Sequence, residues 1–231
     1  MTYMNHQNVS QKTNCPICNS ETKDKNVHFY KYRDCLSCGH SFSSINEKAS
    51  TKHYHNVHLR EMKSNGELMQ QAVTMNHIKR MNKIAQEKRE LLTMFSLHGK
   101  RILDLEAETG MLNEDDGDIT SLTQIPHIKI NLLSSKFDTI YNTTGLFDAI
   151  ISFNYIEHQK DVFKDAPFIL NKLNKNGKWI VSIPIDNDPS KKYTGRIHEF
   201  TNHSSILFAS EINYDFEIFN KGDSVVFVFS K

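Results

Sequence analysis

Short apolar runs in the second half of the chain predict buried β-strands. The strongest run is Phe147–Phe153, and a second one covers Lys178–Pro184. Between them, apolar residues over positions 162–173 recur at helical spacing, and this helix is expected to end at the polar turn before Gly177. A strand, a helix, a glycine turn and a strand form a βαβ unit, so the two strands should lie parallel in one sheet.

An earlier part of the chain shows a long helical pattern followed by another strand. From Glu67 to Leu97, apolar residues recur every three or four positions, which predicts one long helix or two consecutive helices packed on a sheet. The run Arg101–Leu105 then predicts a buried strand, and an acidic turn that ends at Gly110 follows it.

The stretch between this turn and Phe147 has a weaker pattern. Its apolar runs at Ile119–Leu122, His127–Leu133 and Phe137–Tyr141 are compatible with short strands. The pattern leaves the order of these strands in the sheet open.

The composition describes a soluble chain of balanced charge. Of the 231 residues, 38% are hydrophobic and 24% are charged, and the net charge is +1. That balance argues against nucleic acid and anionic membranes as partners, and the basic run Lys79–Arg89 reads either as a solvated helix face or as a local patch. No apolar run approaches the ~20 residues that span a bilayer, and the polar N-terminus lacks a signal-peptide core. We therefore expect a cytoplasmic protein without a membrane partner.

The four cysteines form a duplicated pair within one short segment. Cys15 and Cys18 are followed, after sixteen residues, by Cys35 and Cys38. Structural disulfides are rare in the cytoplasm, and a spacing of two residues lets one tight turn aim both sulfurs at one metal ion. Four sulfurs in a tetrahedron suit Zn2+ in a closed, structural site. The alternative is four free thiols or a redox pair, for which a lone C-x-x-C would be the usual pattern.

This segment therefore predicts a small zinc ribbon in which the metal substitutes for a hydrophobic core. Val27–Tyr32 is expected to form one of its strands, and Gly39 supplies left-handed backbone after the second pair. His40 is either an additional ligand or a surface residue. The predicted division of the chain is a flexible N-terminus over 1–12, the zinc ribbon over 13–42, a linker over 43–65 and an α/β domain over 66–231.

The motifs of the α/β domain resemble a known family. KRILDLEAETG, at 100–110, is similar to the first strand and D-L-G-x-G-x-G turn of class I S-adenosylmethionine (SAM) methyltransferases. FDAIISFNYIEHQKDVFKDAPFILNKLNKNGKWIVSIP, at 147–184, is similar to their FDxI…EH…L…LkpGG…P segment. The later sequence His198-Glu199-Phe200-Thr201 resembles the H…F(S/T) element before their last helix. The resemblance covers roughly residues 67–231.

This resemblance implies a Rossmann-like α/β fold, a methyltransferase sheet with helices on both faces, preceded by the small zinc ribbon. The last helix would cover Ile206–Ile212, and Phe216–Phe219 and Val225–Phe229 would form a closing antiparallel hairpin. A four-Cys ribbon ahead of such a domain is similar to sugar C-methyltransferases that act on nucleotide-linked deoxysugars. The implied cofactors are Zn2+ and SAM.

The resemblance also assigns candidate residues to the SAM site. In the family, the turn after the first strand approaches SAM so closely that a side chain would collide, which is why it carries glycines. By position, Asp104, Glu106, Glu108 and Gly110 would line this site, with Glu106 and Glu108 in place of two glycines. Asn154 follows the strand whose end faces the transferred methyl group.

Three residues are candidates for catalysis. Tyr155 stands at the same strand end as Asn154, and His158 or His198 could act as a general base because histidine titrates near neutral pH. The alternative for the Glu157–His158 pair is a capping or surface role.

Two functions of different classes follow from these motifs. The first is a SAM-dependent methyltransferase that acts on a small-molecule substrate such as a nucleotide-linked sugar. The second is a methyltransferase-like chain that has lost the cofactor and binds a protein partner as a scaffold through its ribbon. The stretch 106–118 is the feature that separates them, because the bulk of Glu106 and Glu108 at the turn argues against the usual pose of SAM, although their carboxylates could suit its cationic groups.

Overall fold

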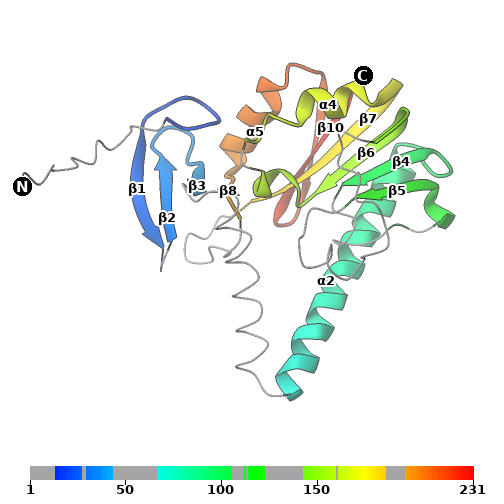
Figure 1. Cartoon of the computed structure of the whole chain (residues 1–231), viewed down its shortest axis with the longest axis horizontal. Helices are drawn as coiled ribbons and strands as arrows, with labels where there is room; N and C mark the ends of the chain where they lie inside the picture. The colour runs from blue at the N-terminus through cyan, green and yellow to red at the C-terminus, as the bar shows by residue number, and fades with distance from the viewer. Residues whose placement is uncertain are drawn as a thin grey trace, which may run out of the picture.

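A computed structural model of the whole chain describes residues 14–27, 30–43, 67–105, 112, 114–122, 143–159, 161–185 and 196–231 (Figure 1). These residues form two sheets. A small sheet lies at the N-terminal side, and a six-stranded sheet with its helices forms the body of the molecule.

The body is built on a mixed sheet of strand order β5-β4-β6-β7-β10-β9. Its strands are β4 (Arg101–Leu105), β5 (Asp118–Leu122), β6 (Phe147–Phe153), β7 (Leu173–Pro184), β9 (Phe216–Lys221) and β10 (Ser224–Ser230). The first four are parallel, whereas β10 runs antiparallel to both β7 and β9. This arrangement confirms the predicted fold class, including the antiparallel hairpin at the end of the sheet.

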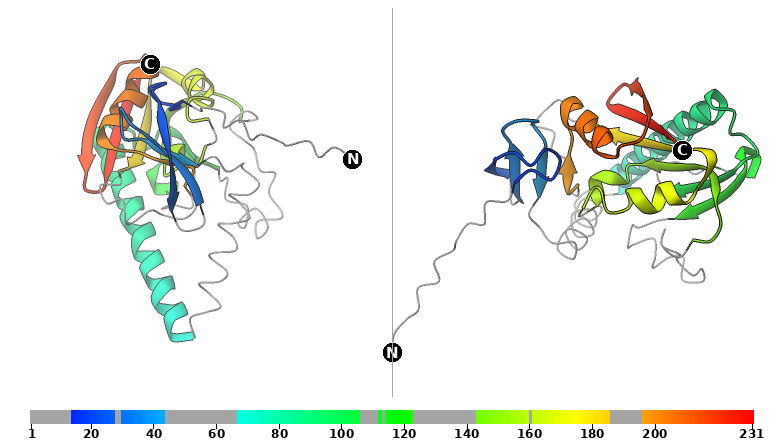
Figure 2. Two further views of the ribbon diagram at one scale, coloured as in Figure 1. Left: turned by 90° about the vertical axis from the view of Figure 1, so that its left-hand side faces the viewer. Right: turned by 90° about the horizontal axis from the view of Figure 1, so that it is seen from above.

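Helices cover both faces of this sheet (Figure 2). Helix α2 (Glu67–Met94) lies on one face, and α4 (Ala166–Asn171) and α5 (Asn202–Glu211) lie on the other. Successive side chains of β10 point to opposite faces of the sheet, so both faces carry apolar side chains that a helix can cover. Val226 and Val228 belong to the apolar core under α2, whereas Phe227 and Phe229 belong to the core under α4 and α5.

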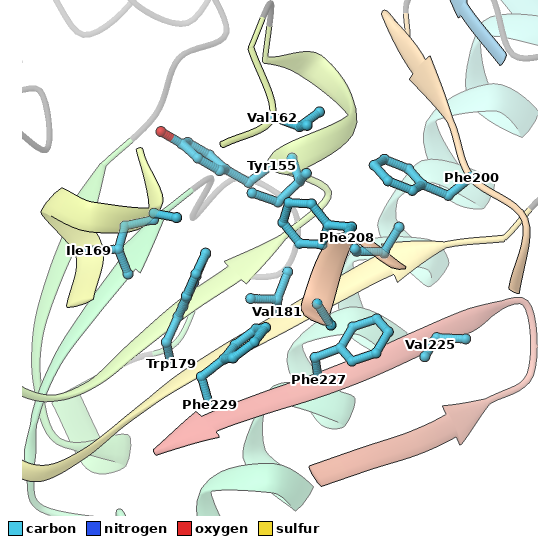
Figure 3. Packing of buried hydrophobic residues seen from close by; sticks show 14 of the residues in the cluster. Tyr155, Val162, Ile169, Trp179, Val181, Phe200, Phe208, Val225, Phe227 and Phe229 are labelled. Carbon is cyan, nitrogen blue, oxygen red and sulfur yellow. The ribbon is translucent and has the colours of Figure 1, made fainter. Parts of the chain in front are cut away.

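The larger core is aromatic and sits under α4 and α5 (Figure 3). Trp179 of β7 stacks on Phe229 of β10 with ring centroids 5.1 Å apart, and its indole nitrogen donates a hydrogen bond of 2.8 Å to Ser152 Oγ. The stacking therefore joins β7 to β10, and the satisfied buried donor joins β7 to β6.

The helix expected over 162–173 is shorter than predicted. Helix α4 has six residues, and the chain already enters β7 at Leu173, so the prediction that Gly177 ends a helix is wrong. Phe147 pairs with Leu173 but Ala149 pairs with Lys178, so residues 174–177 bulge out of the strand. Asn176 adopts a φ of 65° there, the left-handed backbone that was expected at the glycine.

Three consecutive charged residues of α2 fix this helix to three different elements. Lys88 Nζ donates to both carboxylate oxygens of Asp104 in β4, at 2.9 and 2.8 Å. Arg89 Nε lies 3.1 Å from both carboxylate oxygens of Asp116, in the 3-10 helix η1 (Glu114–Asp116), and Glu90 accepts from Lys221 of β9. The interpretation of the basic run as a solvated face is therefore wrong for Lys88, which is fully buried.

The small sheet has the order β1-β2-β3-β8 and is antiparallel throughout. Its strands are β1 (Thr22–Val27), β2 (Tyr30–Cys35), β3 (Ser41–Ser43) and β8 (His198–Glu199). Val27 pairs with Tyr30, so the chain reverses within the segment that was predicted to be one strand. The fourth strand comes from the C-terminal part of the chain, which sequence reasoning did not anticipate.

None of the helices within the described residues is long and apolar enough to cross a membrane.

The buried pair of Lys88 and Asp104 generates a prediction about stability. Lys88→Met should destabilise the protein by about 3–5 kcal/mol, because it leaves the Asp104 carboxylate in the core without a partner. Urea unfolding would measure this. Lys83→Met is the matched control, because Lys83 is exposed and its pairing with Glu87 contributes little. Equal losses for both variants would contradict a special role of the buried pair.

Candidate functional site

The four cysteines come together at one point of the small sheet. One sulfur from each of Cys15, Cys18, Cys35 and Cys38 lies within 4.8 Å of the other three. Three of the separations are short: 3.7 Å between Cys15 and Cys38, 3.4 Å between Cys18 and Cys35, and 3.5 Å between Cys18 and Cys38. A tetrahedron with Zn–S bonds of ~2.3 Å has edges of roughly 3.8 Å, so the cluster fits a zinc ion.

Backbone donors around the sulfurs support the same assignment. The amides of Ile17, Ser37 and Cys38 point at Cys15 Sγ or Cys35 Sγ, each at 3.4 Å. Gly39 closes the second turn with a φ of 72°, as predicted. Amides directed at sulfur stabilise thiolate charge, which is the state that binds a metal ion.

Two of the thiols are in an environment where charge is costly without a cation. Burial raises the pKa of Cys15 to about 11 and that of Cys38 still further. Burial opposes ionisation of Cys18 too, but hydrogen bonds from Ser20 lower the pKa of Cys18 to about 6. A bound divalent ion would supply the charge that lets Cys15 and Cys38 ionise.

A second candidate site lies where β4 and β6 end. These strands are adjacent and parallel, and Leu105 pairs with Ser152, so their carboxyl ends meet at one edge of the sheet. Asn154 directly follows β6 with a φ of 52°, and it is partly exposed. In open α/β sheets this edge is where ligands bind.

Asp104 does not face this edge. Its carboxylate is fully buried under α2, and both oxygens accept from Lys88. Burial raises the pKa of the Asp104 carboxyl, and the neighbouring ammonium group partly offsets that rise. The geometry thus gives Asp104 a role in fixing β4 to α2, and Lys88 is a residue that sequence reasoning missed.

The other candidate cofactor residues, Glu106, Glu108 and Gly110, lie outside the described residues. The possible strands His127–Leu133 and Phe137–Tyr141 and almost all of the predicted linker do so as well.

The three candidate catalytic residues lie in different surroundings. Tyr155 is buried in the core under α4 (Figure 3). Its hydroxyl donates to Asp165. His158 ends the 3-10 helix η2 (Ile156–His158) that follows β6, and its side chain is exposed. Of the three, His158 alone has an exposed side chain.

His198 lies instead between the small sheet and the body. Its Nδ1 is 3.0 Å from Nε2 of His40, the two rings stack at a centroid distance of 5.2 Å, and both side chains are buried. His40 is therefore neither a surface residue nor one of the four clustered ligands. Burial is the main cause that lowers the pKa of His40 below its usual value.

A buried carboxylate connects the two regions. Glu157 of η2 is 1% exposed, and Arg196 Nε lies 3.9 Å from its Oε1. Its carbonyl accepts from the Ile197 amide at 2.9 Å, just before β8. The segment after β6 thus contacts the strand that completes the small sheet.

Comparison with known proteins identifies the fold. No protein-family model and no curated protein matches this chain. Among solved structures, it is similar to 1,6-didemethyltoxoflavin-N1-methyltransferase from Burkholderia thailandensis, solved with bound 1,6-didemethyltoxoflavin and S-adenosylhomocysteine. The match has a TM-score of 0.51 and 13% identity, and covers 85% of this chain and 97% of that one.

The chain has the methyltransferase fold. At this identity the likeness shows the fold alone. Magnesium protoporphyrin IX methyltransferase from Synechocystis PCC 6803 is a further match, at 7% identity and a TM-score of 0.46, over 80% of this chain and 100% of that chain.

The metal centre can be tested by removing one ligand. The wild-type chain is expected to bind one zinc ion, and Cys38→Ser should release it and destabilise the small sheet, because the described residues of the ribbon bury few apolar side chains besides the cysteines, namely Ile17, Tyr32 and Phe42. Metal content after dialysis and thermal unfolding would measure both effects. Ser37→Ala is the control, since Ser37 lies between the ligands with an exposed side chain. Equal zinc in both variants would refute the assignment.

Proposed function

We propose that this protein transfers a methyl group from SAM to a small molecule. The supporting observation is the edge formed by the carboxyl ends of β4 and β6, in a sheet of methyltransferase order. The neighbour from Burkholderia thailandensis was solved with S-adenosylhomocysteine and a small acceptor. A nucleotide-linked sugar is the acceptor class that the ribbon and the sequence resemblance suggest.

In this proposal, SAM supplies the methyl group, and the chain positions the acceptor for in-line attack on it. Positioning contributes most of the rate in such a transfer. Asn154 stands at the strand end, and its left-handed backbone turns the chain sharply before η2. His158 is our proposed general base, because among the three candidates it combines an exposed side chain with a place next to this edge.

A second candidate function is that of a scaffold that no longer binds SAM. Two observations favour it. Glu106 and Glu108 replace glycines of the resembled turn, and the Asp104 carboxylate is already occupied by Lys88. Against it, the SAM sulfonium and amino groups are cationic, so carboxylates near them are electrostatically compatible with binding.

Calorimetric titration with SAM and S-adenosylhomocysteine separates the two functions. We expect Glu106→Gly/Glu108→Gly to tighten SAM binding about ten-fold, or ~1.4 kcal/mol, because glycine lets the backbone approach the ligand. Glu106→Gln/Glu108→Gln is the matched control, which removes the charges but keeps the bulk. Absence of heat at millimolar ligand in the wild type and in both variants would favour the scaffold.

A further inference from the structure

The segment Arg196–Thr201, which we call the seam segment, contacts both the metal-binding ribbon and the edge of the proposed active site. On the ribbon side, Ser41 pairs with Glu199 and Phe42 pairs with His198. The Ser43 amide donates to the Ile197 carbonyl at 2.8 Å, and the Tyr32 hydroxyl donates to the Arg196 carbonyl at 3.3 Å. The ribbon sheet is thus completed by backbone from the body.

The loop that carries Cys35 and Cys38 contacts the seam segment directly. Thr201 Oγ1 donates to the Cys38 carbonyl at 2.8 Å, and a Cβ on Gly39 would come within 3.1 Å of Thr201 Cγ2. His40, two residues after Cys38, packs against His198. The backbone of this loop is closed by Gly39 donating to Cys35 and by Cys35 donating to His40. Its shape therefore depends on the same turn that aims Cys35 and Cys38 at the metal.

The other side of the seam segment faces the body. The Ile197 amide donates to Glu157, in the turn that follows β6 and Asn154. Phe200 forms a bridge to Ile185, directly after β7. Thr201 caps α5, because its hydroxyl accepts from the Ser204 amide at 3.1 Å while the Ser204 hydroxyl accepts from the Thr201 amide. The segment thus holds the carboxyl ends of β6 and β7 and the start of α5.

We propose that metal binding by the four cysteines fixes the seam segment, and through it η2 and the beginning of α5, so that the ribbon controls the order of the active-site edge. In the described part of the ribbon, few apolar side chains besides the cysteines are buried. Loss of the metal would therefore loosen the loop at Cys35–His40. Linkage then requires the reverse effect, in which a weakened seam lowers the affinity for zinc. The coupling rests on the metal centre, and its effect on methyl transfer rests on the proposed function.

The first test uses the full chain with and without zinc and reads amide hydrogen exchange. On zinc removal, we expect the amides of Ser43, Ile197 and Ser204 to exchange at least ten-fold faster, while amides of the β9–β10 hairpin, at the far edge of the body sheet, keep their protection. Unchanged exchange at Ile197 and Ser204, with loss of protection at Cys15 and Asn19 in the ribbon, would overturn the proposal.

The second test measures zinc affinity by competition with a chelator and does not depend on activity. Thr201→Val should lower the affinity about three- to ten-fold, since it removes one hydrogen bond to the metal loop. Thr201→Ser keeps the hydroxyl and should remain within two-fold of wild type. A role of Thr201 confined to capping α5 would lower thermal stability and leave zinc affinity unchanged.

Tyr32→Phe removes a seam contact without touching α5 or a cysteine, and Tyr214→Phe, at an exposed tyrosine after α5, is its matched control. We expect weaker zinc binding for Tyr32→Phe alone. Equal affinities in Thr201→Val, Tyr32→Phe and wild type would overturn the proposal even if the zinc-free chain unfolds completely. Failure of SAM binding would leave these zinc measurements unaffected, so the coupling and the proposed function can fail separately.

Discussion

Two pairs of residues in neighbouring strands, Ser41 with Glu199 and Phe42 with His198, join the four-cysteine ribbon to the body. An unpaired edge of a small sheet is exposed to competing contacts, and pairing with β8 removes one such edge. The contact is also desolvated, because His40 and His198 are buried against each other. A ribbon held in this way is part of the architecture of the body.

The body contains a buried charge pair, and one member of that pair lies in β4. The carboxyl end of such a strand is part of the edge where open α/β sheets bind ligands. Lys88 and Asp104 are both fully buried, and each would be costly alone. Together they fix α2 to β4, the strand that leads into the candidate SAM turn. The next two charged residues of the helix, Arg89 and Glu90, are more exposed than Lys88 and pair with Asp116 and Lys221. The position of β4 therefore depends on electrostatics inside the core as well as on apolar packing.

The candidate active site combines features that favour and oppose ligand binding. The parallel strands β4 and β6 end side by side, and Asn154 turns the chain away from the edge. Glutamates stand where the resembled family has glycine, so any bound SAM must tolerate bulk and can gain from opposite charge. Of the catalytic candidates, Tyr155 and His198 are engaged in buried contacts, whereas the side chain of His158 is exposed.

The sequence by itself determined the elements whose signals are local. The spacing of the four cysteines predicted their cluster, which consists of Cys15, Cys18, Cys35 and Cys38. The apolar run Phe147–Phe153 predicted a central strand. Both features could be predicted because cysteine spacing and apolar runs are properties of residues close together in the sequence. Only the tertiary structure decided the partners of Lys88, His40 and His198, and that β8 completes the ribbon. Those contacts join residues from 16 to 158 positions apart, and a local pattern carries no information about which distant backbone or charge will meet it.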